Sequence, residues 1–209
     1  MTNSKTIANY LLQIKAIKLD PANPFTWASG WKSPIYCDNR KILSFPQIRT
    51  QVRDAFAQAI KEKYPQAELI AGVATGAIAH GALVADILGL PFIYVRSSAK
   101  EHGLTNLIEG HYETGSKVVV IEDLISTGGS SLKAVNALRD AQCDVLGMVA
   151  IFTYEFENAI RNFQQANCQL TTLSNYSALI EQALTEKFID EAQLQSLKQW
   201  RIAPDVWGI

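Results

Sequence analysis

The stretch "VVVIEDLISTGGSS", residues 118–131, runs four β-branched apolar residues into two adjacent acids, Glu122 and Asp123. A turn rich in serine, threonine and glycine follows, and an amphipathic helical pattern over 130–141 comes after it. This order predicts a buried strand whose apolar part, 118–121, ends where the acids appear, followed by a tight loop and a helix.

Strands and helices alternate along the middle of the chain. The strand segments are continuous apolar runs, which are typical of strands buried on both faces of a sheet. The pattern predicts an α/β fold with an open, mostly parallel sheet flanked by helices. Its ligand should lie at the carboxyl ends of the strands, near the point where strand order reverses. Strands are expected near 69–73, 92–96, 117–122, 144–152 and 168–173, and helices near 76–88, 130–141 and 155–166.

Both ends of the chain differ from this middle part. Residues 6–18 place apolar side chains on one helical face, 25–43 are aromatic-rich and predict short strands and loops, and 174–209 hold two more helical patterns. Because neither repeats nor linkers divide the chain, 1–209 is expected to form a single domain.

Two helices carry capping-box patterns at their starts. Ser44 and Gln47 fit the pattern at the start of a helix that ends before Pro65, and Asp190 and Gln193 fit it before the last helix.

Composition excludes several classes of protein. The 209 residues are 48% hydrophobic, enough for one buried core, and a net charge of −1 lacks the basic excess typical of nucleic-acid binding. The 3 cysteines are widely spaced and favour a reduced, cytoplasmic compartment over a disulfide framework. The apolar stretch 69–95 carries His80 and Asp86 near its middle, so it is expected to fold as strand, helix and strand and not as a membrane span.

The loop after the acids has the chemistry of an anion site. Gly128 and Gly129 let the backbone approach a ligand, and N–H groups at the helix start can bind a phosphate together with serine and threonine hydroxyls. Glu122 and Asp123 would repel that phosphate, so they should face a diol or a bound Mg²⁺ on the same ligand. A phosphorylated ribose fits both parts. The alternative is an N-capping turn with solvated acids.

At these residues the chain resembles a known family. "VVVIEDLISTGGSS" resembles the phosphoribosyl-diphosphate (PRPP) binding motif of type I phosphoribosyltransferases. Two further segments, "FTWASGWKSPIYCDNR" (25–40) and "RSSAKEHG" (96–103), resemble the N-terminal substrate segment and the mobile catalytic loop of orotate phosphoribosyltransferases. The resemblance covers nearly the whole chain. It implies the type I fold with a small hood built from about 1–45 and 174–209.

The resemblance implies transfer of the 5-phosphoribosyl group from PRPP to orotate, which gives orotidine 5′-monophosphate (OMP) and diphosphate in the synthesis of UMP. Breaking the C1–diphosphate bond creates a highly charged leaving group, which cations must stabilise. The expected catalytic residues are Arg96, Lys100, His102 and Asp123. The residues expected to bind PRPP are Thr75, Gly76, Arg96, Lys100, His102, Glu122, Asp123, Leu124, Ile125, Ser126, Thr127, Gly128, Gly129 and Ser130.

The orotate side departs from the family pattern. Tyr154 stands where many relatives have an arginine that holds the orotate carboxylate, and Lys32 and Arg40 are the two candidates to compensate. Ser126 lies where the family hydroxyl contacts orotate, and Tyr36 could stack on the pyrimidine. The residues expected to bind orotate are Lys32, Tyr36, Cys37, Ser126 and Tyr154.

The family further implies a cofactor and a partner. Mg²⁺ would be held mainly by PRPP, with Glu122 and Asp123 as candidate contacts through water, and the protein would be a homodimer with shared active sites. Nucleic-acid and membrane partners are not expected. A purine or xanthine phosphoribosyltransferase and a PRPP-sensing regulator are the alternatives, since both share the PRPP motif. Near-neutral charge and the cationic loop 96–103 argue against the regulator.

Overall fold

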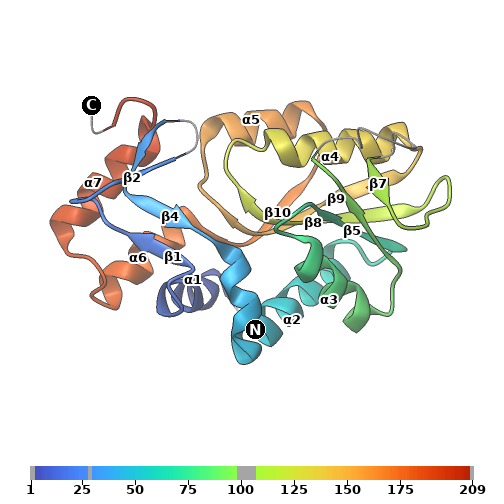
Figure 1. Ribbon diagram of the computed structural model, residues 1–209, viewed down its shortest axis with the longest axis horizontal. Coiled ribbons are helices and arrows are strands. Elements are labelled where there is room, and N and C mark those ends of the chain that lie inside the picture. The colour runs from blue at the N-terminus through green and yellow to red at the C-terminus, as the bar shows by residue number, and fades with distance from the viewer. Residues whose placement is uncertain (1–2, 28–29, 98–106, 208–209) are drawn as a thin grey trace.

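The computed structural model describes residues 3–27, 30–97 and 107–207. Within these residues, its centre is a 6-stranded sheet with the order β10-β9-β8-β5-β6-β7 (Figure 1). The strands pair in parallel except for β7, which is antiparallel to β6. The predicted open, mostly parallel sheet is confirmed. The strands are β5 (Leu69–Val73), β6 (Phe92–Val95), β7 (Ile108–Glu109), β8 (Lys117–Ile125), β9 (Asp144–Thr153) and β10 (Leu170–Asn175).

Helices cover both faces of this sheet, as its continuous apolar strands require. Figure 1 shows α2 (Pro46–Lys63) and α3 (Ile78–Leu88) on one side, and α4 (Gly129–Asp140) and α5 (Glu157–Gln165) on the other. Every residue of β5 is buried between these two layers. The core therefore lies on both faces of the sheet and leaves the ends of the strands open.

The apolar stretch 69–95 folds as β5, α3 and β6. Gly89 ends α3 in the left-handed conformation, with φ of 66°, which a glycine adopts without strain. A search of the described ranges found no helix with both the length and the apolar character needed to cross a membrane.

Strand order reverses between β5 and β8. From β5 the chain crosses through α3 to β6 on one side, whereas β8 pairs with β5 on the other side. The carboxyl ends of β5 and β8 therefore lie side by side, and the crossovers that leave them diverge. In open α/β sheets this point is where ligands bind.

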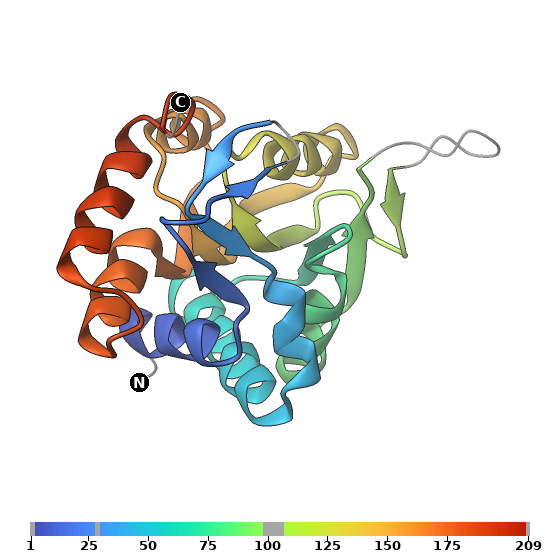
Figure 2. The ribbon, with the colours of Figure 1, turned by 60° about the vertical axis from the view of Figure 1, so that its left-hand side comes forward.

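The two ends of the chain meet beside the sheet and form the hood. Helix α1 packs against α6 at the left of Figure 1, and Figure 2 brings this side forward. Strand β1 pairs with β4, and β2 pairs with β3, both antiparallel. The hood elements are α1 (Ser4–Gln13), β1 (Ile17–Leu19), β2 (Phe25–Thr26), β3 (Lys32–Ser33), β4 (Ile35–Cys37), the 3₁₀ helix η1 (Asn39–Ser44), α6 (Tyr176–Thr185) and α7 (Glu191–Ile202).

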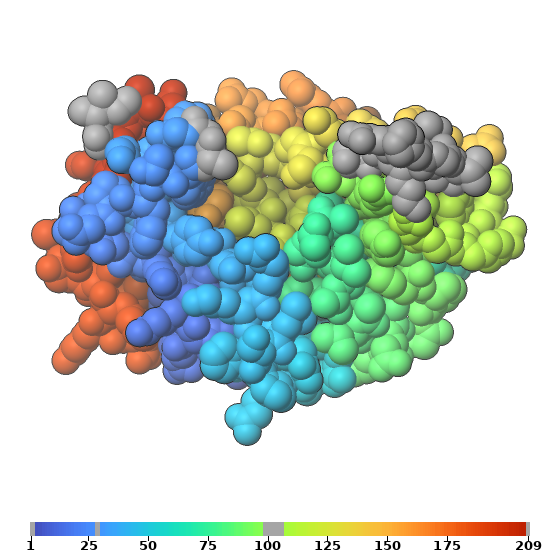
Figure 3. Space-filling model, in the orientation of Figure 1, coloured from blue at the N-terminus to red at the C-terminus, as the bar shows by residue number. Residues whose placement is uncertain are grey.

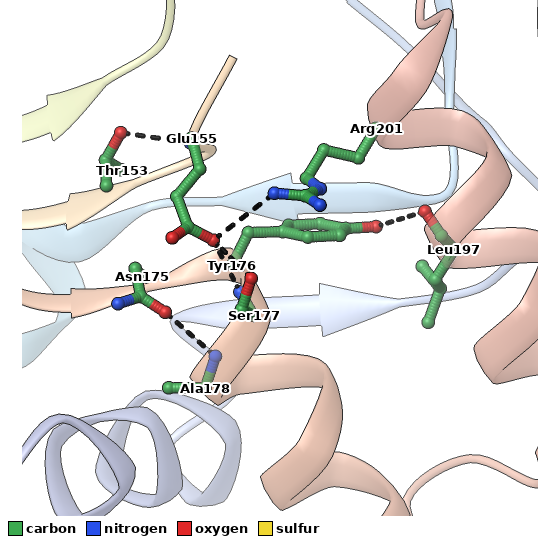
Figure 4. Close-up of polar contacts among 8 residues, drawn as sticks. All are labelled: Thr153, Glu155, Asn175, Tyr176, Ser177, Ala178, Leu197 and Arg201. Atoms are coloured by element: carbon green, nitrogen blue, oxygen red, sulfur yellow. Dashed lines mark hydrogen bonds and ion pairs between the residues drawn. The ribbon is translucent and has the colours of Figure 1, made fainter. Parts of the chain in front are cut away.

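Glu155 links the hood helices α6 and α7 to the carboxyl end of β9 through hydrogen bonds and an ion pair (Figure 4). Its Oε2 accepts hydrogen bonds from the Ser177 backbone N–H at 2.9 Å and from the Ser177 hydroxyl at 2.6 Å. The same oxygen lies 3.7 Å from Nη1 of Arg201 on α7. Tyr176 donates to the Leu197 carbonyl at 3.0 Å and ties α6 to α7. These contacts hold the hood next to the strand ends.

One of the two expected capping boxes forms. Asp190 and Gln193 make both reciprocal bonds of the box at the start of α7. The box expected from Ser44 and Gln47 is wrong, because Ser44 is the last residue of η1 and Phe45 is the N-cap of α2, with no side-chain hydrogen bond.

Two element ends also differ from the sequence pattern. The helical pattern 6–18 stops at Gln13, since Lys15 takes φ of 54° and turns the chain into β1. The strand expected at 168–173 lies two residues later, as β10. Asn167 takes φ of 46° in the turn after α5, and two more residues connect this turn to the start of the strand.

Candidate active site

A cavity of about 450 Å³ opens at the carboxyl ends of β5 and β8. Residues from three segments line it: the hood segment 37–40, the β5–α3 turn 73–76, and the segment 122–131. Figure 3 shows this face hollowed between blue atoms of the N-terminal segment and green atoms beside the sheet, with yellow atoms of the β8–α4 region set back between them. The cavity therefore lies at the switch point of the sheet.

The two acids lie within β8 and not after it. The strand continues to Ile125, so the expectation that it ends near residue 122, where the acids appear, is wrong. Pairing explains the extra length, because Glu122, Leu124 and Ile125 keep their register with β9. Alternate residues of a strand point to opposite faces, so Glu122 and Asp123 do not share one environment.

Glu122 lines the cavity but is buried, with 4% of its surface exposed. Its Oε2 accepts a 2.7 Å hydrogen bond from the Ser131 hydroxyl, and its Oε1 accepts a 2.9 Å bond from the Asp123 backbone N–H. Burial, and next the nearby Asp123 carboxylate, raise the pKa of Glu122 to about 8. Glu122 thus uses both oxygens inside the protein, whereas Asp123 is only half-buried and lines the cavity.

The loop that follows leaves a helix start open to the cavity. Gly128 has φ of 80°, and a Cβ there would meet the ring of Phe163 at 2.6 Å, so the position requires glycine. The amide of Asn162 donates to the Thr127 carbonyl at 3.0 Å and fixes the loop. Helix α4 begins at Gly129 with no side-chain cap among the described residues, so its first N–H groups are available to an anion.

The β5–α3 turn approaches Asp123 closely. A Cβ added at Gly76 would overlap the Asp123 carboxylate, so a larger residue would fit only if that side chain moved. The Ala74–Thr75 peptide bond in this turn is cis. Thr75 and Gly76, both expected to bind PRPP, line the cavity next to Asp123.

Asn39 joins the hood to the acids, although no sequence pattern marked it as a site residue. Its Nδ2 donates a 2.6 Å hydrogen bond to the Asp123 carbonyl, and its Oδ1 lies 3.4 Å from the Cys37 sulfur. Burial lowers the pKa of the His80 ring on α3. Both Asn39 and His80 are buried. Asn39 is a polar residue with only 1% of its surface exposed. Such burial of a polar side chain points to a specific role, and only the structure reveals it.

Arg96 is the one of the three expected catalytic cations, Arg96, Lys100 and His102, that lies within the described residues. It follows β6, and its Nη1 lies 3.6 Å from Oε1 of Glu109. It lines a second cavity of about 420 Å³ that shares Val73, Ala74 and Ser130 with the first. Lys100 and His102 lie outside the described residues.

The residues expected to bind orotate divide into two groups. Cys37 and Ser126 line the cavity, and burial raises the pKa of the Cys37 thiol. Lys32, Tyr36 and Tyr154 are not among its lining residues in the described part of the chain.

Each of these three side chains has other contacts. Lys32 is exposed and donates to the Thr26 hydroxyl at 3.0 Å. Tyr36 pairs with Phe25 at 5.7 Å between ring centres. Tyr154 is buried in an aromatic cluster with Trp27, Phe152, Phe156, Tyr176 and Trp200. Arg40, the other candidate to compensate for the missing arginine, does line the cavity.

Comparison with known proteins agrees with this geometry. A family model described as a phosphoribosyl transferase domain matches residues 38–170, which include the three segments of the cavity except Cys37. The fold and the loop after β8 thus define a phosphoribosyltransferase. Within that class the chain belongs to the orotate phosphoribosyltransferase family. An orotate phosphoribosyltransferase of Porphyromonas gingivalis is 59% identical to it over 208 residues, which cover 100% of this chain and 99% of that protein.

Solved structures share the fold at lower sequence identity. The UMP synthase of Leishmania donovani matches with a TM-score of 0.81 and 24% identity, over 95% of this chain and 42% of that longer chain. The orotate phosphoribosyltransferase of Aeropyrum pernix matches with a TM-score of 0.77 and 24% identity, over 88% of this chain and 99% of its own. The described sheet, helices and hood are thus those of an established fold.

Proposed function

We propose that this protein transfers the 5-phosphoribosyl group from PRPP to orotate, forming OMP and diphosphate on the route to UMP. The observation that carries the proposal is the cavity at the switch point. There an uncapped helix start, suited to a phosphate, and the Asp123 carboxylate, suited to a diol, face one space. The full-length similarity to orotate phosphoribosyltransferases supports orotate over a purine base as the acceptor.

Different residues of the chain then bind different parts of PRPP. The N–H groups of Gly129 and Ser130, with the Thr127 hydroxyl, hold the 5′-phosphate, and Asp123 accepts hydrogen bonds from the ribose hydroxyls. The diphosphate lies toward the β5–α3 turn and Arg96. As the C1–oxygen bond breaks, negative charge grows on the diphosphate, and Arg96, Lys100 and His102 stabilise it. The N1 atom of orotate forms the new bond to C1 and gives up its proton, which the departing diphosphate takes.

Mg²⁺ is the cofactor that we propose for this step. The described residues contain no group of three or more His, Cys, Asp or Glu side chains that could hold a metal ion. The cavity does present Asp123, which suits a single contact through water, while the hydrogen bonds of Glu122 occupy its oxygens. When bound with PRPP, Mg²⁺ would neutralise charge on the diphosphate. Titration of Mg²⁺ in a calorimeter should give binding only when PRPP is present.

We also propose a cytoplasmic homodimer in which the loop 96–103 serves the neighbouring subunit's site. The family resemblance and the cysteine usage support this proposal. Size-exclusion chromatography with light scattering should give about twice the mass of one chain. A monomer that retains full activity would contradict the shared-site arrangement.

A panel of bases tests the function directly. Orotate, uracil, hypoxanthine, xanthine and adenine would each be supplied with PRPP and Mg²⁺, and diphosphate release would be followed. Orotate should be the only good acceptor. Faster turnover with a purine base would favour the purine transferase, and binding of PRPP without turnover of any base would favour the regulator.

A further inference from the structure

Arg40 is the one cationic side chain among the described residues that line the main cavity. The acidic side chains that line it are Asp38, Glu122 and Asp123. Because the pKa of Glu122 is about 8, its side chain is neutral at neutral pH, but Asp38 and Asp123 would repel an acceptor that carries a carboxylate unless a cation faced it. Since 61% of the Arg40 side chain is exposed, the guanidinium can be reached from solvent.

Asp38 holds Arg40 in a defined orientation. Nε of Arg40 donates to Oδ1 of Asp38 at 2.7 Å, and this bond lowers the pKa of Asp38 and raises that of Arg40. Within the described ranges, the two terminal nitrogens of Arg40 donate no hydrogen bond to the protein. A guanidinium held by Nε keeps its terminal nitrogens for a second planar acceptor, and a carboxylate matches that fork.

The other candidates for this role are less well placed. Lys32 already donates to Thr26 and does not line the cavity. Tyr154 has 2% of its surface exposed and packs edge-on against Trp200. It is an uncharged side chain buried in the aromatic cluster, so it cannot supply a positive charge to the cavity.

We propose that Arg40 binds the carboxylate of the acceptor and that Asp38 is the residue that positions it. This inference rests on the proposed function, because it names the residue that selects a pyrimidine carboxylate at the same site. Arg40 would act mainly in binding, since the carboxylate does not change charge during the transfer.

OMP and UMP make a matched pair of ligands, because they differ only in this carboxylate. Their dissociation constants would be measured by calorimetry for the wild type, Arg40→Ala, Arg40→Lys, Lys32→Ala and the control Arg53→Ala. The Arg53–Asp54 pair is also 2.7 Å long but lies on α2, outside the cavity. Arg40→Ala should weaken OMP by about 10- to 100-fold, the effect of losing a charge-assisted bond, and UMP by less than about threefold. Arg40→Lys should recover part of the loss, and Arg53→Ala should change neither affinity.

Three results would overturn the assignment. Equal weakening of OMP and UMP by Arg40→Ala would place Arg40 on the phosphoribosyl part. Unchanged OMP binding would remove its role, and a selective loss of OMP in Lys32→Ala alone would transfer that role to Lys32. A wild-type protein that binds OMP no better than UMP and does not use orotate would contradict the proposed function itself, and the inference with it. Melting temperatures of all variants would show that each is folded.

Discussion

The side-chain amide of Asn39 donates a 2.6 Å hydrogen bond to the backbone carbonyl of Asp123, a residue 84 positions away in the sequence. Asn39 opens the 3₁₀ helix of the hood, and Asp123 lies near the end of the central strand. The bond therefore joins the segment that we expect to contact the acceptor to the carboxylate that we expect to contact the ribose. It sets the distance between the two halves of the cavity.

Loss of this bond should cost both stability and activity. Asn39→Ala leaves a buried carbonyl of Asp123 without its donor, which should lower the free energy of unfolding by about 1–3 kcal/mol. Chemical denaturation measures this loss. Asn23→Ala is the matched control, since its amide makes a 3.4 Å bond on an exposed turn and should cost less than about 0.5 kcal/mol. Equal stability of the two variants would show that the Asn39 bond contributes little.

Gly76 should tolerate alanine only when the Asp123 side chain is shortened. The added methyl group overlaps the Asp123 carboxylate, so Gly76→Ala should destabilise the fold by about 1–3 kcal/mol through overpacking and should raise the KM for PRPP. In an Asp123→Ala background the same substitution should cost much less. A double-mutant cycle based on denaturation measures the coupling. Additive effects would mean that the turn moves away without disturbing Asp123.

Glu122 should make the protein less stable as pH rises. Its pKa is about 8 in the folded protein, against an ordinary value of 4.5. Between these two pH values the folded state keeps the proton on Glu122, whereas the unfolded state has lost it. Stability from this group is therefore complete below about pH 4.5 and is lost as pH rises through about 8.

Glu122→Gln tests this, because the amide imitates the protonated acid and can still accept the Asp123 N–H bond. The melting temperature of the variant minus that of the wild type should increase from pH 5 to pH 9. The matched variant Glu186→Gln changes an exposed acid that accepts a hydrogen bond from the uncharged Gln182 amide, and it should show no such trend. A difference that is flat across pH for Glu122→Gln would mean that Glu122 is already ionised at low pH.

Lys100→Ala should lower kcat far more than thermal stability. If its ammonium meets the diphosphate mainly as charge develops, its loss should cost about 10²–10³ in rate, as for other single donors in closed sites. Steady-state kinetics and thermal melting give the two quantities. A large rise in the KM for PRPP with kcat unchanged would instead indicate a role in ground-state binding.

Complementation tests whether the site is shared. Mixing Lys100→Ala protein with Asp123→Asn protein should restore part of the activity, because hybrid dimers would contain one site with an intact loop and an intact acid. Differently tagged chains purified together prove that hybrids form. Hybrids that stay inactive would show that each loop serves its own chain.

The sequence alone determined which segments form the parallel strands of the sheet and the chemistry of the loop that we expect to bind PRPP. Both depend on residues that are close together in the chain. An apolar run such as 69–73 must be buried on both faces wherever it lies in the sheet, and the glycines and hydroxyls of 126–131 act through the local backbone. These features can be predicted without knowing which distant segments are in contact. The resemblance to orotate phosphoribosyltransferases rested on them and on segments 25–40 and 96–103.

Only the tertiary structure decided which hood residues reach the cavity. Lys32 and Arg40 lie eight positions apart and have the same charge, yet the packing of the hood on the strand ends brings Arg40 to the cavity and leaves Lys32 outside its lining. Packing likewise buries Glu122 while its neighbour Asp123 faces the cavity. These outcomes depend on contacts between segments far apart in sequence, such as Asn39 with Asp123, and the free energy of such contacts is fixed by how the elements dock and not by any local pattern.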